Sequence, residues 1–330
     1  MDLLDLSLFN DTFFAAYPAD TTISPKNAED VYPLSMAILA LIGSILGIIG
    51  NLLILIAIGI TKELRSRSHF FLFILAIVDL INCIYYSYVR ILIFTGNFFM
   101  SNHQCFLHSV IGLFTMNIQS GLTAAVGIDR YLSISYPMEY RMRKALPYLF
   151  CTFTPVLIYA IVITVWGYLE TSDNVIVAVC FPPSAYNKSS KVAWLASNGI
   201  IVILVMFLYG AAQYNLKKFQ RIRSKSTISL EQTAIRAQQS LSVIMFVYAA
   251  TWAFTMFALL FMSAFSVSKE TQKTVEIFLA WPVIINGSCN LLIYWWRSMT
   301  FRDAFKRIFC CCRNDKLEPS DRERRMTYSV

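Results

Sequence analysis

Seven long apolar runs constrain this chain more than any other feature. We place them at residues 34–60, 69–93, 105–133, 145–168, 192–216, 237–264 and 273–296. Each is at least as long as the roughly 20 residues with which a helix crosses a hydrocarbon core of about 30 Å. Lipid offers the backbone no hydrogen-bond partners, so each run is expected to be a helix. The sequence therefore predicts an all-α membrane protein with a seven-transmembrane helix bundle.

The charged residues predict the orientation of the bundle. Six acidic residues and one lysine stand among the first 30 positions, whereas the loops after the first, third, fifth and seventh runs are basic. The positive-inside rule then places the N-terminus outside the cell and the C-terminus in the cytoplasm, in a multi-pass protein of the plasma membrane. The net charge of +8 reflects this topology and the lipid headgroups, so we expect no nucleic-acid partner.

Four segments follow from this topology. We predict an extracellular tail over 1–33, the bundle over 34–298, a short amphipathic eighth helix over 299–312 and a cytoplasmic tail over 313–330.

Two kinds of modification are predicted on opposite sides of the membrane. Asn10 and Asn187 begin glycosylation sequons that both fall on the outer side. Cys310, Cys311 and Cys312 follow the amphipathic run beside basic residues, which suits lipidation and attachment to the inner leaflet. The alternative for these cysteines is three free cytosolic thiols.

The run from Cys105 to Tyr131 links the two faces of the membrane. Cys105 precedes Arg130 by 25 positions, which is roughly 38 Å of helix. The Asp129-Arg130-Tyr131 triplet therefore lies at the inner face, where an acid and a base are costly unless they are paired or switched. Cys180 is the other cysteine predicted outside, so we expect a Cys105–Cys180 disulfide in that oxidising environment.

Asp79 is an acid within the second predicted span. An acid in the membrane interior is a functional candidate, and it is equally a candidate hub for hydrogen bonds from Asn51, Asn286 and Asn290. The two interpretations are compatible, and both stay open from the sequence.

Several motifs occur together in a familiar order. They are Asn51 in GNLL, Asp79 in LAIVDL, Asp129-Arg130-Tyr131, Cys180, Tyr248 with Trp252, and Asn290 to Tyr294 in NLLIY. Over about residues 34–312 the chain resembles the rhodopsin-like (class A) G-protein-coupled receptors. The segment YWWRSMTFRDAF also resembles the nematode serpentine chemoreceptors of the sx class.

The resemblance implies an activation mechanism. Asp129 would pair with Arg130 at rest, and on activation Arg130 would turn toward Tyr209 and Tyr294 as a cavity opens for a heterotrimeric G protein. Tyr248 and Trp252 would be the aromatic switch residues, although Trp252 is also a candidate packed core residue.

The chain departs from that family at several positions. Ile201, Phe254 and Leu291 stand where prolines are usual, and Gln119 stands where a serine often flanks a sodium site at Asp79. The Gln119 amide could occupy that site itself, so sodium binding stays open and no other cofactor is expected.

Ligand classes are narrowed by exclusion. Gly112 and Ile284 replace the aspartate of amine receptors and the retinal lysine of opsins. Arg90 shares a helix face with Asp79. It would either hold an anionic group of the ligand or pair with Glu276, and we slightly favour the pairing with Glu276. Further pocket candidates, placed by helix position alone, are His108, Met116, Trp194, Asn198, Thr255 and Met256.

These features predict a receptor rather than an enzyme. The chain has three histidines, none near another inside a span, and no carboxylate pair for acid–base chemistry. We expect a chemosensory receptor for an extracellular small molecule, with a neuropeptide receptor of the same fold as the alternative. A seven-helix channel or transporter is the rival from another class, but the sequence shows neither the repeats nor the polar pore positions these proteins use.

Overall fold

The structure is a computed structural model of the 330-residue chain. It describes residues 16–18, 32–64, 67–97, 99–177, 179–223, 246–247, 250–255, 257–259, 261 and 269–309.

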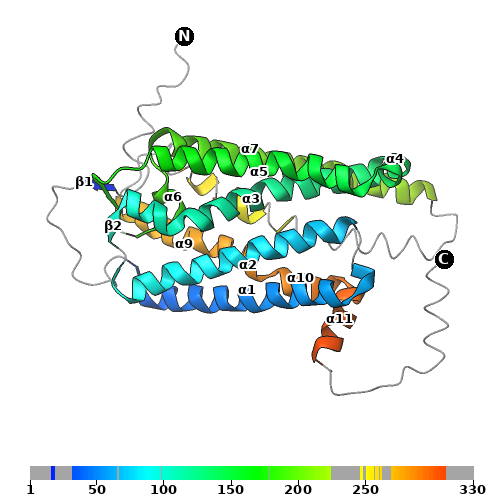
Figure 1. The fold of residues 1–330 in the computed structure, drawn as a ribbon, viewed down its shortest axis with the longest axis horizontal. Coiled ribbons are helices and arrows are strands. Elements are labelled where there is room, and N and C mark those ends of the chain that lie inside the picture. Colours follow the sequence, from blue (N-terminus) through cyan, green and yellow to red (C-terminus); the bar gives the residue numbers. More distant parts are fainter. Residues whose placement is uncertain are drawn as a thin grey trace, which may run out of the picture.

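Five described helices are long and apolar enough to cross a membrane. They are α1 (Leu34–Ile60), α2 (Arg67–Phe94), α3 (Asn102–Ser135), α5 (Ala145–Leu169) and α7 (Lys188–Arg223). The helices lie side by side with their long axes roughly aligned (Figure 1). Each covers one of the first five predicted runs, and the sixth run, 237–264, falls largely outside the described residues.

The seventh predicted run is two helices rather than one. α9 (Lys269–Ser288) and α10 (Asn290–Arg297) are separated at Cys289. Pro282 lies inside α9, where its ring removes one backbone donor. The break falls beside Asn290, whose side chain reaches Asp79 of α2. The hydrophobic pattern continues across the break, which is why the sequence predicted a single span.

α3 is the centre of the bundle. It packs against α2, α5 and α7 and is the most buried of the five candidate spans. Its first turn is closed by a capping box, in which the Ser101 hydroxyl accepts from the backbone of Gln104 and the Gln104 side chain accepts from the backbone of Ser101. The outer faces of α1, α5 and α7 carry many exposed aliphatic and aromatic side chains, as expected of surfaces that face lipid.

A small sheet covers the predicted extracellular end. β1 (Ala16–Pro18), β3 (Val175–Val177) and β2 (Met100–Ser101) form three antiparallel strands in that order. The all-α prediction did not include these strands. The predicted disulfide between Cys105 and Cys180 is confirmed and ties the segment after β3 to α3.

Short helices complete both ends. α6 (Pro182–Ala185) follows the disulfide, and Asn102 of α3 donates 2.9 Å hydrogen bonds to the carbonyls of Ser184 and Ala185. At the predicted inner end lie η3 (Lys62–Leu64), α4 (Pro137–Met142) and α11 (Met299–Phe309). α11 buries Phe301, Ala304 and Phe305 and exposes Lys306 and Arg307, so it is amphipathic.

Candidate functional site

The Asp129–Arg130 pair lies near the C-terminal end of α3, which is its predicted inner end. Asp129 is fully buried, and the Arg130 guanidinium donates to its Oδ2, with the Nε bond at 3.1 Å. The ion pair expected from the family resemblance is therefore present. A carboxylate removed from water needs such partners, because its desolvation is otherwise uncompensated.

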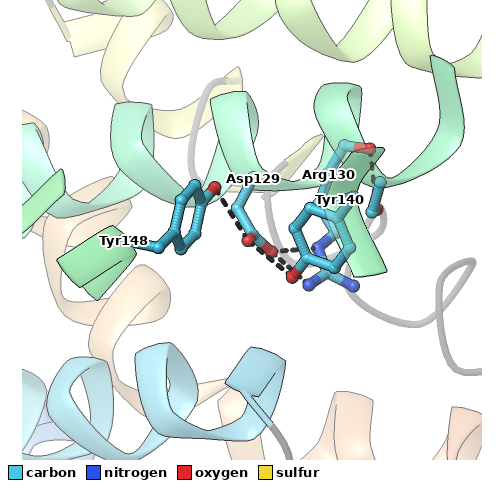
Figure 2. A network of polar contacts seen from close by, with 5 residues as sticks. Asp129, Arg130, Tyr140 and Tyr148 are labelled. Atoms are coloured by element: carbon cyan, nitrogen blue, oxygen red, sulfur yellow. Dashed lines mark hydrogen bonds and ion pairs between the residues drawn. The ribbon is translucent and has the colours of Figure 1, made fainter. Parts of the chain in front are cut away.

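Two tyrosines complete the coordination of Asp129. The hydroxyls of Tyr140 and Tyr148 donate to its Oδ1 at 2.8 and 3.0 Å. Figure 2 shows both rings pointing toward the carboxylate beside Arg130. Tyr140 comes from α4 and Tyr148 from α5, and their rings meet edge to face with centroids 5.9 Å apart. The Asp129 carboxylate of α3 is thus held by two neighbouring elements.

The other predicted switch residues lie apart from this cluster or outside the described part. Tyr131 is half-buried on α3, and Tyr209 of α7 lies against Phe246 with ring centroids 6.0 Å apart. Tyr294 of α10 is buried and stacks on Phe301 of α11 at 4.6 Å. Trp252 is buried within the apolar core, and Tyr248 lies outside the described residues.

Asp79 is the hub of a buried polar chain across α2, α3 and α10. The amide of Asn290 donates to its Oδ2 at 2.6 Å, and the amide of Gln119 donates to its Oδ1. Gln119 Oε1 accepts from Asn82 at 3.0 Å, and Asn82 Oδ1 accepts from Thr115 at 2.6 Å. The hub interpretation of Asp79 therefore matches the geometry, with Asn82 and Thr115 as members that the sequence analysis did not include.

The other two predicted members of the hub do different things. Asn51 donates to the carbonyls of Gly47 and Gly287, both at 2.9 Å, and so joins α1 to α9. Asn286 is buried, and its carbonyl accepts a long contact from the Cys289 thiol. Asn51 is therefore not a partner of Asp79, because its amide is turned toward the backbone of α1 and α9. Among the described residues the hydrogen bonds to Asp79 come from Gln119 and Asn290 and not from the Asn286 side chain.

The residues around Asp79 do not fit a sodium ion. Sodium needs oxygen ligands, yet both carboxylate oxygens accept from amide N–H groups, and the Gln119 oxygen faces Asn82.

Four predicted pocket residues are buried between helices. Trp194 donates to Asn117 at 3.0 Å, and Asn198 accepts from Ser120 at 2.7 Å, so α7 is bonded to α3. Met116 packs in the apolar core, and the Thr255 hydroxyl donates to its own helix at Thr251. The first two side chains therefore join helices rather than line an open site.

Gly112 and His108 differ from the expected pocket positions. A Cβ at Gly112 would lie 2.4 Å from the Tyr85 ring, so this glycine permits the close approach of α2 and α3. His108 is exposed and bonds Tyr88 at 2.7 Å on the outside of the bundle, which corrects its assignment to the pocket. Met256 and the side chain of Glu276 lie outside the described residues.

Arg90 is the one buried cation of the described outer half of the bundle. Its side chain is 2% exposed, and its guanidinium carbon lies 5.4 and 5.3 Å from the ring centroids of Tyr32 and Phe181. Sequence spacing predicted the inward direction of Arg90 but not these two rings, which come from segments outside the spans.

Comparison with known proteins identifies the family. A family model described as serpentine type 7TM GPCR chemoreceptor Srsx matches residues 44–309. The chain belongs to this family. This match confirms the predicted seven-helix bundle, the rhodopsin-like receptor class and the resemblance to the sx chemoreceptors. The protein is therefore a multi-pass membrane receptor and not an enzyme.

Curated relatives are more distant. The chain is 26% identical to cannabinoid receptor 1 of Xenopus laevis, over 85% of the chain and 64% of that protein. It is 23% identical to the tachykinin-like peptides receptor 86C of Drosophila melanogaster, over 80% of the chain and 56% of the relative. It is also 23% identical to melanocortin receptor 4 of Danio rerio, over 81% of each. The chain thus spans less than two thirds of the length of the first two relatives.

Proposed function

We propose that this Srsx protein is a chemosensory receptor that binds an extracellular small molecule in its helix bundle and activates a heterotrimeric G protein. The buried Asp129–Arg130 pair carries the proposal, because it sits at the inner end of α3 and is held by α4 and α5. A switch requires an element with two arrangements, and the restrained end of α3 would be the resting one. The family match supports the same assignment.

The proposed cycle starts from the restrained state. Ligand binding at the outer half would favour a bundle in which Arg130 leaves Asp129 and turns inward, and the opened surface would accept a helix of the G protein. Tyr209, Asn290 and Tyr294 are the proposed partners in that state. The tachykinin-like relative supports a peptide receptor as the second candidate, which a ligand panel distinguishes.

Orientation and modifications belong to the same proposal. The basic loops support a cytoplasmic C-terminus and an extracellular N-terminus. We assign glycans to Asn10 and Asn187 and lipidation to Cys310, Cys311 and Cys312. Asn10 and the three cysteines lie outside the described residues, while Asn187 precedes α7.

G-protein activation in cells tests the function. Wild type and Arg130→Ala would be compared at matched surface levels against volatile, acidic and peptide ligands, with Lys62→Ala, an exposed basic residue, as the control. We expect a ligand response that the Arg130→Ala variant loses and the control keeps. An equal response in the Arg130→Ala variant would contradict the proposed switch, and a response to peptides alone would favour the second candidate.

A further inference from the structure

Arg90 is a buried charge without a charged partner among the described residues. It lies four positions before the end of α2 and is 2% exposed. A guanidinium in that environment loses its hydration, and the loss is strongly unfavourable unless an anion or hydrogen-bond acceptors replace the water. Charges within spans are rare for this reason and mark binding or transport sites.

The aromatic contacts of Arg90 replace only part of that hydration. Tyr32 and Phe181 present their rings to the guanidinium, and the two ring centroids lie 5.8 Å apart. Cation–π contacts of this kind are weak compared with the solvation that a buried guanidinium loses. The ring faces offer no acceptor to the N–H groups, and Arg90 Nε has no hydrogen-bond partner.

Two buried donors lie next to each other here without acceptors. Arg90 Nε and the Tyr86 hydroxyl have no hydrogen-bond partner, and Tyr86 stands one helical turn before Arg90 on the same face. The acids described at the outer end have other partners: Asp173 accepts from Ser101 at 3.0 Å, and Glu170 accepts from Ser190 at 2.6 Å. Two unsatisfied donors one helical turn apart on the same face would be served by a group rich in acceptors.

We propose that Arg90 binds the anionic head of a small organic ligand, a carboxylate or another oxyanion, with Tyr86 as the second donor. The guanidinium fork matches such groups with two parallel hydrogen bonds. The assignment deepens the proposed receptor function and rests on it for its physiological meaning.

The surroundings of Arg90 indicate the rest of the ligand. Tyr86 and Val89 belong to an apolar cluster that continues to Met116 and Trp252, so the body attached to the anionic head is apolar. Phe181 follows the disulfide-bonded Cys180, and Tyr32 lies two residues before the start of α1. These two rings cover the site and would have to separate to admit the ligand.

Thermal unfolding of the purified full-length receptor tests the site without using a G protein. The probes are hexanoate, decanoate and hexyl sulfate, with methyl hexanoate and methyl decanoate as uncharged counterparts. A ligand that binds only the folded state raises the unfolding midpoint. We expect a rise with at least one anion and none with its ester, loss of the rise in Arg90→Gln and partial retention in Arg90→Lys. Tyr88→Phe, on the exposed face of α2, is the matched control.

Three results would overturn the proposal. The first is an equal rise with acid and ester, and the second is no rise with any anion. The third is coupling to Glu276: if Arg90→Gln lowers the unfolding midpoint in the wild-type background but not in the Glu276→Gln background, the arginine is half of an internal ion pair. We expect equal shifts in both backgrounds.

This experiment separates the inference from the function. Anion binding that depends on Arg90, in a receptor that activates no G protein, would leave the site standing and reject the function. If Arg90→Gln leaves G-protein activation unchanged and no anion affects unfolding, the receptor function would stand and the anion site would be rejected.

Discussion

The hydroxyl of Tyr140 lies 2.8 Å from Oδ1 of Asp129, while the guanidinium of Arg130 bonds to Oδ2 of the same carboxylate. Tyr148 shares Oδ1 at 3.0 Å. The acid that restrains Arg130 is therefore itself held by two phenols from α4 and α5 (Figure 2). In the proposed switch these bonds would hold the carboxylate in the orientation that pairs with Arg130, so they would act as a brake on activation.

Removal of this brake is expected to raise basal signalling. Hydrogen bonds to charged groups contribute about 1.5–3 kcal/mol. Tyr140→Phe should therefore shift the resting equilibrium toward the active state by roughly tenfold or more, and the Tyr140→Phe/Tyr148→Phe double variant should shift it further. GTP turnover without ligand measures the effect, with the exposed Tyr136→Phe as the control. Unchanged basal turnover in the double variant would show that the phenols do not restrain the switch.

Local spacing and topology predicted part of this arrangement. Asp129 and Arg130 are neighbours in sequence, and Cys105 and Cys180 are the cysteines predicted outside, so neither pair needed knowledge of packing. Tyr140 and Asn82 were missed because their partners lie on other helices, and the direction of each side chain depends on how those helices rotate.

Rotation also explains the error at His108. Successive residues of a helix point about 100° apart, so His108 is exposed while its neighbour Ser109 is fully buried and accepts from Tyr85 at 3.0 Å. A pocket residue that is assigned from its position along a helix alone is therefore wrongly assigned if the position is off by a single residue. The rings over Arg90 could not be predicted at all, since they come from segments outside the helical periodicity.

Sodium should have no effect on the wild-type protein. The Gln119 amide already occupies Oδ1 of Asp79, so replacing sodium by N-methylglucamine should leave the unfolding midpoint unchanged. Gln119→Ser removes that amide and leaves an oxygen beside the carboxylate, and sodium should then raise the midpoint. The gain should vanish when Asp79→Asn is added. A sodium effect in the wild type would contradict the replacement of the ion by the amide.

Loss of the disulfide should impair the outer end selectively. Cys105 and Cys180 close a loop of 75 residues, and removal of a native disulfide typically costs about 2–5 kcal/mol. Cys180→Ser should lower the unfolding midpoint and the ligand response, because Phe181 beside Arg90 is no longer held. Cys151→Ser changes an exposed free cysteine and is the control. Equal responses in Cys180→Ser and Cys151→Ser at matched surface levels would exclude a role of the disulfide in ligand binding.

Glu170 should make the outer loop sensitive to acid. Its partial burial alone would raise the pKa of Glu170, but hydrogen bonds from Ser189, Ser190 and Trp166 outweigh burial and hold the pKa below its ordinary value. A lowered pKa in the folded state means that this stabilisation is complete above the ordinary pKa of about 4.3. It is lost as the pH falls through the folded value.

The matching measurement compares wild type with Glu170→Gln. The difference between the unfolding midpoints of the two proteins should be constant near neutral pH. It should shrink once the pH falls below the ordinary pKa of a glutamate carboxyl group. A difference that does not change with pH would show that the carboxylate charge plays no part in these bonds.

Gly112 should tolerate no side chain. A Cβ there would lie 2.4 Å from Cδ1 and Cγ of Tyr85, closer than any real contact, so Gly112→Ala must push α2 away from α3. Overpacking of this kind costs about 1–3 kcal/mol, and displacement of the ring also strains the hydrogen bond from Tyr85 to Ser109. The unfolding midpoint should fall in Gly112→Ala and recover partly when Tyr85→Ala is added. Gly199→Ala, where the new methyl group would meet nothing within 4 Å, should leave the midpoint nearly unchanged. Equal unfolding midpoints of Gly112→Ala and Gly199→Ala would show that the close approach of α2 and α3 does not depend on a glycine at position 112.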